Sequence, residues 1–209
     1  MEATKWEAMI ETIRSVLDSP LAYRAWSRLL GVRRYSRVLV KEHIRPESSD
    51  RILEIGCGPG TIIPFLPTTD YVGFDASPEY IKLAQKRFPG LHFVCERVSR
   101  YTLAERGYFD IVLAFGILHH LDDAEAVQLF RIAHDALKPG GRLVTHDGVW
   151  TSNQSGIAKY LLARDRGQFV RTGEHYVTLA SQVFSTVRHT IRHDLLWIPY
   201  THILLECVR

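Results

Sequence analysis

The 209-residue sequence has few cysteines and little net charge. Its three cysteines, Cys57, Cys95 and Cys207, lie far apart and form no CxxC pair, which argues against a disulfide framework and against a structural zinc site. Lys and Arg number 26 against 23 Asp and Glu, so the formal net charge is only +3. This balance excludes a chain whose affinity for nucleic acid or anionic membranes comes from bulk positive charge.

Long apolar runs are also absent. No stretch approaches the roughly 18 apolar residues that a membrane span needs. Residues 1–18 carry charges throughout and lack the apolar region of a signal peptide. The composition is nevertheless 46% hydrophobic and 11% aromatic, which is enough for a buried core and excludes a disordered chain. We therefore expect a soluble, cytoplasmic protein with no membrane span.

Residues 1–49 are predicted to form an N-terminal cap of helices. Apolar residues recur there at steps of three and four, as on one face of an amphipathic helix: Trp6, Met9, Ile10, Ile13 and Leu17. Ser19-Pro20 is a typical helix start, and a further helical stretch runs to about His43. The polar run RPESSD then links this cap to the main domain, residues 50–209.

Strand-like and helix-like segments alternate along the main domain. Short apolar runs predict five strands, at residues 51–55, 71–74, 92–95, 109–115 and 142–145. A capped helix is expected from Ser77 to Phe88. A second helix begins at the capping box Asp122-x-x-Glu125, and the KPGG run after Leu137 ends it. Strands that alternate with helices predict a mostly parallel sheet with helices on both faces.

Two later regions break this alternation. Residues 151–183 are first polar and then helical and charged, and we predict that they form a lid-like insertion in the main domain. The last two β-rich runs, 186–195 and 201–208, have the spacing of an antiparallel hairpin with a wide connection. We expect the N-terminal helices and the insertion to roof a pocket at the ends of the strands.

The strongest local signal is a glycine-rich turn after the first predicted strand, ILEIGCGPG at residues 52–60. Glycine permits a positive φ and lets a ligand lie against the backbone, so such a turn at the carboxyl end of a strand predicts a nucleotide pocket. The dinucleotide fingerprint GxGxxG needs its third glycine at Thr61, and no GK[ST] of a P-loop follows. The spacing therefore disfavours pyrophosphate binding.

Two carboxylates accompany this turn. Asp75 lies 19 residues after Gly56, just beyond the second predicted strand, where a carboxylate can accept hydrogen bonds from both hydroxyls of a ribose. Glu54, at the mouth of the first strand, can face a cationic group. A nucleoside with a positive charge and no phosphate fits this lining better than NAD does, and S-adenosylmethionine is such a molecule.

Four segments of the main domain form an ordered set of motifs. They are EIGCGPG at 54–60, GFDAS at 73–77, FDIVLAFGILHHLDD at 109–123 and LKPGGRLV at 137–144. Through them the sequence resembles the class I S-adenosylmethionine-dependent methyltransferases, and ordered motifs are far more specific than a lone glycine loop. The resemblance implies a three-layer, Rossmann-like α/β fold whose sheet has seven strands, the last one antiparallel.

The resemblance also implies which residues bind S-adenosylmethionine. They follow the ends of four predicted strands: Glu54, Gly56, Cys57, Gly58, Gly60, Asp75, Ala76, Glu96, Arg97, Val98 and Phe115. Glu54 would line the methionyl part, Asp75 would hold the ribose, and Cys57 would be a small filler rather than a nucleophile. Many relatives have a Gly-Asp pair where this sequence has Glu96-Arg97. The adenine contact is thus left either to the Glu96 carboxylate or to the backbone that follows it.

Two histidines near strand ends are candidate catalytic bases. His119 follows the fourth predicted strand and His146 the fifth, and neutral imidazole takes a proton near neutral pH. The alternative for His119-His120 is a framework feature, because this pair is widespread in the family that the sequence resembles. A metal site that joins both histidines to Asp122 and Asp147 is disfavoured, because Asp122 already caps a helix, and we expect no metal.

Aromatic and basic residues are candidates for an acceptor pocket. The aromatic candidates are Tyr23, Trp26, Trp150, Tyr160, Tyr176 and Tyr200. The basic candidates are Arg164, Arg166 and Arg171. Such aromatic residues more often belong to a core. We interpret the arginines as a solvated helix face paired with Asp165 and Glu174 rather than as a clamp for an anionic acceptor.

The favoured function is transfer of a methyl group from S-adenosylmethionine to a small-molecule acceptor, such as a metabolite, a sugar or a lipid-linked intermediate. A nucleic-acid methyltransferase is the first alternative. Against it stand the small net charge, the lack of an added RNA-binding domain, and FGIL at 115–118 in place of a [DN]PP[YF] tetrad. A non-catalytic S-adenosylmethionine-binding protein and an NAD-dependent oxidoreductase are further alternatives, and the glycine spacing disfavours the latter. We expect no nucleic-acid partner.

Overall fold

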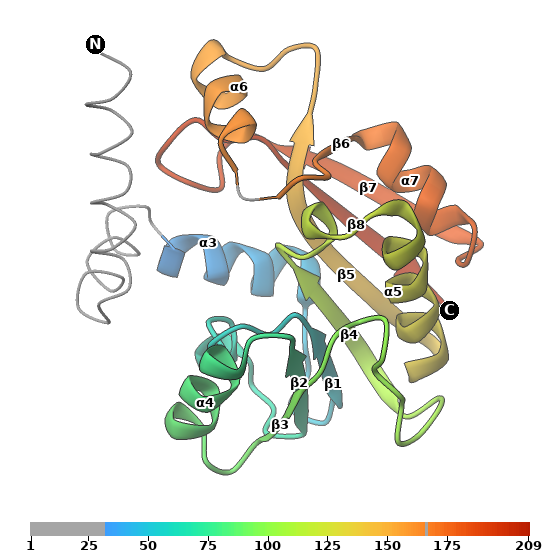
Figure 1. The fold of residues 1–209 in the computed structure, drawn as a ribbon. Helices are drawn as coiled ribbons and strands as arrows, with labels where there is room; N and C mark the ends of the chain where they lie inside the picture. The colour runs from blue at the N-terminus through green and yellow to red at the C-terminus, as the bar shows by residue number, and fades with distance from the viewer. Residues whose placement is uncertain (1–31, 166) are drawn as a thin grey trace.

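Seven strands follow one another in the order β3-β2-β1-β4-β5-β8-β7 in the computed structural model, which describes residues 32–165 and 167–209 (Figure 1). The strands are β1 Ile52–Ile55, β2 Tyr71–Asp75, β3 His92–Cys95, β4 Phe109–Phe115, β5 Leu137–Trp150, β7 Thr186–Arg192 and β8 His202–Val208, and a short β6, Arg171–Thr172, pairs with the end of β5. Strands β1 to β5 pair in parallel, whereas β8 runs antiparallel to both β5 and β7. The predicted Rossmann-like sheet with an antiparallel last strand is confirmed.

Hydrophobic residues on both faces explain why the central strands need two covering layers. All four residues of β1 are buried, as are the first six of β4. Side chains alternate between the two faces along a strand, so continuous burial requires a layer on each side. Leu53 and Val112 belong to the core on one face, whereas Ile52 and Ile111 belong to the core on the other.

Strand β5 is longer than the sequence predicts. Leu137 is expected on a helix and the strand only from residue 142, but Leu137 already pairs with Phe109 of β4. Helix α5, Asp123–Ala136, therefore ends just before it. The KPGG run is an irregularity within the strand, because glycine tolerates the local change of register. The predicted strand at 142–145 was therefore too short, because β5 begins at Leu137 and extends to Trp150.

Helices α5 and α7, Gly173–Ser181, cover one face of the sheet (Figure 1). The Asp122 side chain accepts a hydrogen bond from an amide in the first turn of α5, as the capping box predicts. Helix α7 comes from within residues 151–183, and its Tyr176 is buried in the same core as Phe130 of α5. The second half of this segment thus contributes to the helical layer.

The opposite face carries two helical regions. They are α4, Pro78–Arg87, and the pair formed by α3, Val32–Val38, and the π-helix η1, Leu39–Ile44. Ile44 of η1 and Ile81 of α4 pack in one core with Ile52 of β1. Helix α4 begins as predicted, with the Ser77 side chain accepting a hydrogen bond from the Tyr80 amide. The described part of the N-terminal cap therefore lies against the sheet.

Several sequence predictions lie outside the described residues. They concern the amphipathic pattern from Trp6 to Leu17, the helix start at Ser19-Pro20, and the candidate residues Tyr23, Trp26 and Arg166.

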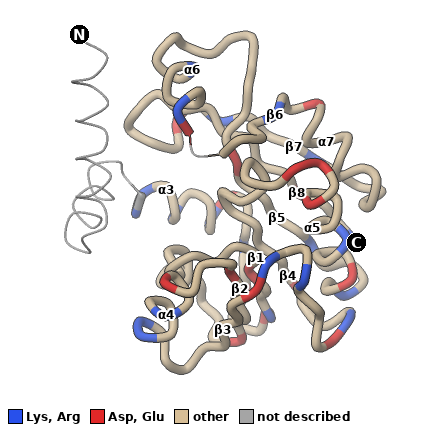
Figure 2. The backbone as a smooth tube through the Cα atoms, viewed as in Figure 1, with Lys and Arg blue, Asp and Glu red and all other residues tan. Residues whose placement is uncertain are grey.

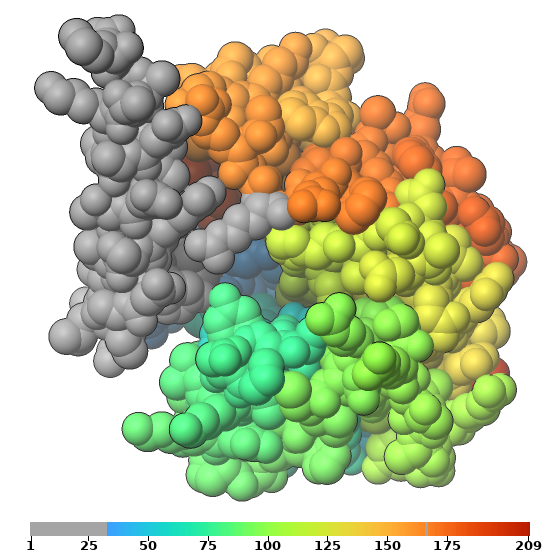
Figure 3. Space-filling model, viewed as in Figure 1, coloured from blue at the N-terminus to red at the C-terminus, as the bar shows by residue number. Residues whose placement is uncertain are grey.

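Helix α6, Gly156–Ala163, follows the carboxyl end of β5 (Figure 1). Figure 3 shows α3, in blue, recessed between the green residues of the α4 side and the orange residues of the α6 side. Acidic and basic residues are mixed along the described backbone rather than separated by sign (Figure 2). Within residues 32–165 and 167–209, no helix combines the length and apolar character that crossing a membrane requires.

Candidate active site

The glycine turn after β1 holds an open stretch of backbone. Gly56, Gly58 and Gly60 have positive φ angles of 72°, 51° and 71°, which L side chains rarely adopt. A Cβ atom on Gly56 would lie 2.6 Å from the Ile117 side chain, and one on Gly60 would crowd Ile63 at 2.7 Å. Nothing lies within 4 Å of the corresponding position at Gly58. Two of the glycines thus permit close packing, and Gly58 turns its backbone toward space that a ligand can occupy.

Asp75, at the end of β2, points toward this turn. Its Oδ2 accepts a hydrogen bond of 2.9 Å from the Gly58 amide, and its Oδ1 accepts one of 2.8 Å from the Ser77 amide. A carboxylate oxygen can accept two hydrogen bonds, so each oxygen keeps capacity for one more donor. The parallel register, with Ile55 opposite Phe74, brings Asp75 to this place. The carboxylate can hold a ligand that presents two hydroxyl groups.

Glu54 is a buried carboxyl in β1 and only 4% exposed. It accepts a hydrogen bond from the Tyr71 hydroxyl, and the described residues offer it no cation. The pKa of Glu54 is raised to about 8. Burial is the largest cause, the hydrogen bond from Tyr71 lowers the pKa by less, and the charge of Asp75 adds to the rise. A bound cation stabilises the ionised form. Glu54 can therefore attract the positively charged end of a ligand.

Cys57 fills space under the turn. Its thiol is buried, and burial raises its pKa well above the ordinary value, so the reactive thiolate does not form at neutral pH. A Cβ atom on Gly73 of β2 would lie 2.9 Å from both the Cys57 sulfur and the Tyr71 hydroxyl. The missing side chain at Gly73 therefore makes room for the Tyr71 contact with Glu54. Motif spacing gives no sign of Tyr71, because its role depends on the pairing of β1 with β2.

The remaining predicted cofactor residues lie along the same edge of the sheet. After β3, the Glu96 amide donates to the Asp75 carbonyl at 3.0 Å, and Glu96 Oε1 accepts a hydrogen bond of 2.8 Å from the Arg97 amide. Val98 is buried, whereas the Ala76 and Arg97 side chains are exposed. Phe115 ends β4 and is half-buried. Because β3, β2, β1 and β4 are adjacent, these residues form one row along the sheet edge.

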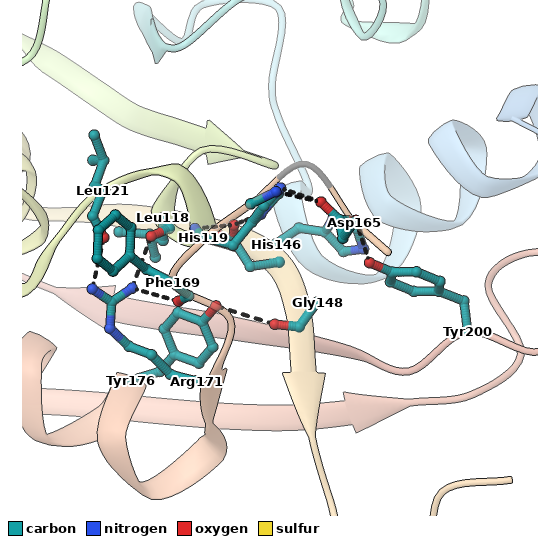
Figure 4. Close-up of polar contacts among 12 residues, drawn as sticks. Leu118, His119, Leu121, His146, Gly148, Asp165, Phe169, Arg171, Tyr176 and Tyr200 are labelled. Carbon is teal, nitrogen blue, oxygen red and sulfur yellow. Dashed lines mark hydrogen bonds and ion pairs between the residues drawn. The ribbon is translucent and has the colours of Figure 1, made fainter. Parts of the chain in front are cut away.

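His119 lies in the 3-10 turn η3, Leu118–His120, between two carboxylates (Figure 4). Its Nδ1 is 2.7 Å from Asp147 Oδ1, and its Nε2 is 3.3 Å from Asp165 Oδ1. Burial alone lowers the pKa of His119, but the two carboxylates outweigh burial and raise it to about 9. The ring is thus protonated at neutral pH with both nitrogens engaged as donors. In this state it has no lone pair to take a proton from a substrate.

His146 is neutral and has one unpartnered nitrogen. The residue is 7% exposed, and its Nδ1 lies 2.9 Å from the Tyr35 hydroxyl of α3. Burial lowers the pKa of His146 well below its ordinary value, and the charges of nearby histidines lower it further. Its Nε2 is buried without a hydrogen-bond partner in the described part of the chain. A neutral imidazole held at one nitrogen and free at the other can accept a proton.

The neighbouring ring of His202 also has an unpartnered buried nitrogen, Nδ1, among residues 32–165 and 167–209. The rings of His202 and His146 have centroids 4.4 Å apart, and burial lowers the pKa of His202 to about 3. Buried polar groups are normally hydrogen bonded, so the free nitrogens of these two adjacent rings suit a polar ligand. Tyr35 and His202 are not predictable from sequence spacing, because they come from α3 and β8.

The candidate basic cluster has structural partners. Arg171 is buried, and its guanidinium donates to the carbonyls of Leu118, Leu121 and Phe169 and pairs with Asp123 (Figure 4). The interpretation of Arg171 as a solvated residue paired with Asp165 or Glu174 was therefore wrong. Arg164 is exposed and lies over the Tyr160 ring at 3.7 Å. The donors of the Arg171 guanidinium are therefore used within the protein rather than offered to an anionic acceptor.

The described aromatic candidates separate into core and site residues. Tyr176 is buried, and its hydroxyl donates to the Gly148 carbonyl at 3.1 Å. Trp150 is half-buried at the end of β5, and Tyr160 is exposed on α6. Tyr200 is the one of these residues that lies beside His202, with ring centroids 4.7 Å apart, and its hydroxyl donates to Asp165 at 2.6 Å.

The residues of the alternative metal site have other partners. Asp122 caps α5, and Asp147 Oδ1 accepts hydrogen bonds from His119. In the part of the chain that the structure describes, no group of three or more His, Cys, Asp and Glu residues is arranged to hold a metal ion.

Comparison with known proteins shows that the segment with the glycine turn is similar to methyltransferases. Residues 52–141 match a family model described as a methyltransferase domain. A demethylmenaquinone methyltransferase from Chlorobaculum tepidum is 27% identical over 119 residues, which cover 54% of this chain and 48% of that protein. An uncharacterized methyltransferase from Oceanobacillus iheyensis is 24% identical over 177 residues, which cover 78% of this chain and 81% of that protein. The chain spans about half the length of the Chlorobaculum relative.

A solved structure shares the fold over most of the chain. Geranyl diphosphate C-methyltransferase from Streptomyces coelicolor, in complex with Mg²⁺, geranyl-S-thiolodiphosphate and S-adenosyl-L-homocysteine, superposes with a TM-score of 0.64 at 16% identity. The match covers 83% of this chain and 74% of that chain. The segment that matches the family model ends within β5. The matched segment thus includes the glycine turn, Asp75 and His119 but not His146.

Proposed function

We propose that this chain is a class I S-adenosylmethionine-dependent methyltransferase and that it transfers a methyl group from S-adenosylmethionine to a small-molecule acceptor. One observation carries the proposal: the open backbone at Gly58 is bonded to Asp75 and lies in the turn that follows the buried Glu54. This lining suits a nucleoside that has a free ribose and a positive charge but no phosphate.

Each part of the row at the strand ends has an assigned role. The free acceptor capacity of Asp75 is for the ribose hydroxyls, and Glu54 faces the positively charged end. We assign the adenine amine to Glu96, whose Oε1 already accepts from the Arg97 amide, so that the carboxylate is held in place. Phe115 borders the pocket at the end of β4. When bound, S-adenosylmethionine supplies an activated methyl group on a positively charged sulfur.

On the acceptor side, we propose His146 as the catalytic base. With the Nδ1 proton donated to the Tyr35 oxygen, the lone pair on Nε2 is free to accept a proton from the acceptor's hydroxyl or ammonium group. Tyr35 fixes the ring orientation, and in this tautomer its oxygen accepts the Nδ1 proton. Burial keeps the imidazole neutral at physiological pH, so the base is in its competent form. His119 contacts Asp147 and Asp165 and holds their segments together. It is not assigned a proton-transfer step.

A small acceptor is favoured by the enclosure of these groups. His146 and His202 are both buried, which favours an acceptor small enough to reach them over a macromolecule that binds across an exposed surface. The name of the Chlorobaculum relative, a demethylmenaquinone methyltransferase, also points to small-molecule chemistry. The charge of +3 gives no support for a nucleic-acid acceptor.

The proposal is tested with S-adenosylmethionine that carries a labelled methyl group. The protein is incubated with separate fractions of small metabolites and of nucleic acids, and His146→Ala serves as the matched variant. We expect label in the small-metabolite fraction with the wild type and a large loss with the variant. Label confined to nucleic acid would contradict the acceptor class. Binding of S-adenosylmethionine without transfer to any fraction would instead indicate a non-catalytic binding protein.

A further inference from the structure

Four side chains form a continuous polar network beside the acceptor site: Asp147, His119, Asp165 and Tyr200. Figure 4 labels the last three of them. It begins on β5, where Asp147 Oδ1 lies 2.7 Å from His119 Nδ1 in η3. It continues from His119 Nε2 to Asp165 at 3.3 Å and ends at the Tyr200 hydroxyl, 2.6 Å from Asp165 Oδ2. The network therefore joins four segments that are distant in sequence.

Asp165 is the junction of this network. It lies in the turn after α6, and both of its carboxylate oxygens are used. Oδ1 faces His119 and accepts a hydrogen bond of 2.9 Å from the Gly167 amide, while Oδ2 accepts from Tyr200. Burial opposes ionisation, but the bonds from His119 and Tyr200 outweigh it and lower the pKa of Asp165 well below its ordinary value. Asp165 is thus ionised across the neutral range.

The backbone that follows Asp165 lies directly against η3. A Cβ atom on Gly167 would lie 2.0 Å from His119 Cδ2, so only glycine permits this approach. The Phe169 amide donates to the His119 carbonyl at 2.9 Å. Arg171 adds hydrogen bonds to the carbonyls of Leu118 and Leu121. Residues 167–171 are therefore held over η3 by these contacts and by the ion pair of His119 with Asp165.

The charges that face His119 explain how it holds two segments of the chain together. Asp147 approaches from β5 and Asp165 from the turn after α6. The His120 ring lies 4.2 Å away between centroids, and His146, the next residue to Asp147 on β5, is neutral. The nearby Arg171 guanidinium is paired with Asp123. One imidazolium thus holds two carboxylates from separate segments together.

We infer that Asp165 is a positioning residue of the acceptor site, because it holds His119 against Asp147 and thereby fixes the end of β5 that carries His146. This inference rests on the proposed function, which places the acceptor at that end of β5. The His146 carbonyl accepts a hydrogen bond of 2.7 Å from the Gly116 amide after β4. A shift of Asp147 therefore disturbs both strand ends around His146, whereas the glycine turn is held separately by Asp75.

The first test is a nuclear magnetic resonance titration of the His119 ring in the wild type and in Asp165→Asn. The amide keeps the shape of the side chain and removes its charge. We expect the pKa of His119 to fall from about 9 toward the ordinary value for histidine. We also expect the Gly167 and Phe169 amides to exchange with solvent about tenfold faster. Tyr200→Phe, which keeps the carboxylate, should give a smaller fall, so the test survives if Asp165→Asn does not fold.

The matched control is Arg164→Gln, which changes the adjacent, exposed residue over the Tyr160 ring. It should leave the His119 titration and both exchange rates unchanged. An unchanged His119 titration in both Asp165→Asn and Tyr200→Phe would overturn the inference. So would an equal effect of the control variant.

A second readout separates positioning from cofactor binding. Asp165→Asn should keep the wild-type affinity for S-adenosylhomocysteine and lower labelled methyl incorporation about tenfold at a fixed acceptor concentration. Asp165→Glu, which restores a carboxylate, should recover part of that loss. Unchanged incorporation would overturn the positioning role. If the wild type itself labels no fraction, the proposed function fails, and the His119 titration still decides whether Asp165 controls this ring.

Discussion

The two sides of the candidate site are built in different ways. On the side of β1, β2 and β3, backbone groups dominate: Gly58 offers open backbone, and Asp75 accepts hydrogen bonds from two amides. On the side of β4, β5 and β8, side chains from distant segments meet, as in the pairs Tyr35–His146 and His119–Asp165. The difference teaches that the cofactor side follows from local sequence, whereas the acceptor side depends on how the whole chain folds.

The most severe test of the cofactor side is Gly58→Val. The substitution fills the open space and forces a β-branched residue to a φ of 51°, so binding of S-adenosylhomocysteine should be abolished. Gly140→Val is the matched control, because Gly140 also has a positive φ, 78°, and open space around its Cβ position, but lies elsewhere in the sheet. It should lose stability and keep the wild-type affinity. Equal losses of affinity, measured by calorimetry, would show that backbone strain alone explains the effect.

On the acceptor side, His146→Ala should have the next largest effect. Loss of a general base lowers turnover by about 10²- to 10⁴-fold, while affinity for S-adenosylhomocysteine should stay unchanged because His146 lies away from the glycine turn. Tyr35→Phe should cause a smaller loss, since it removes only the hydrogen bond to Nδ1. Labelled methyl incorporation measures both. His189→Ala, on the exposed edge strand β7, is the control; a comparable loss there would contradict the assignment.

Asp75→Ala should weaken binding of S-adenosylhomocysteine by about tenfold or more, because two hydroxyl donors lose a paired acceptor. The change also releases the Gly58 amide, so the turn itself should loosen. Glu79→Ala is a suitable control, because Glu79 contacts the Ser77 hydroxyl nearby and is exposed. An unchanged dissociation constant for Asp75→Ala by calorimetry would refute its proposed role at the ribose.

The smallest expected effect is a pH dependence from Glu54. A bound cation favours the ionised carboxylate, so the affinity for S-adenosylmethionine should rise as the pH is raised through about 8. S-adenosylhomocysteine lacks the positive sulfur and should show a smaller rise. The folding stability of the free protein should change with pH in the opposite direction. Because the pKa of Glu54 is raised in the folded state, its contribution to stability is fully present below about pH 4.5 and is lost as the pH rises through about 8. Glu54→Gln should remove both dependences, and a rise that persists in this variant would exclude Glu54.

The sequence could predict those features that depend on neighbouring residues. The glycine spacing at 56, 58 and 60 and the position of Asp75 after β2 are local patterns, and the structure brings them together through one parallel register. The alternating strands and helices likewise predicted the sheet, which is confirmed. The end of α5 was misplaced because an apolar residue such as Leu137 fits the buried side of a helix as well as a buried strand. Only its pairing with Phe109 assigns it to β5.

The contacts that sequence reasoning could not provide are long-range ones. Tyr71 reaches Glu54 only through the register of two strands, and Tyr35 reaches His146 across more than a hundred residues. The two candidate histidines looked equivalent in sequence, since each follows a predicted strand. In the structure His119 is charged between two carboxylates, whereas His146 is neutral with one free nitrogen. Their surroundings, rather than their positions in the sequence, separate their roles.

Calorimetric titration of the wild-type protein with S-adenosylhomocysteine and, separately, with NAD tests the central claim most directly. We predict saturable binding of S-adenosylhomocysteine at one site per chain and no measurable heat with NAD, because the turn at Gly58 suits a nucleoside without a pyrophosphate. Tight binding of NAD without binding of S-adenosylhomocysteine would contradict the account.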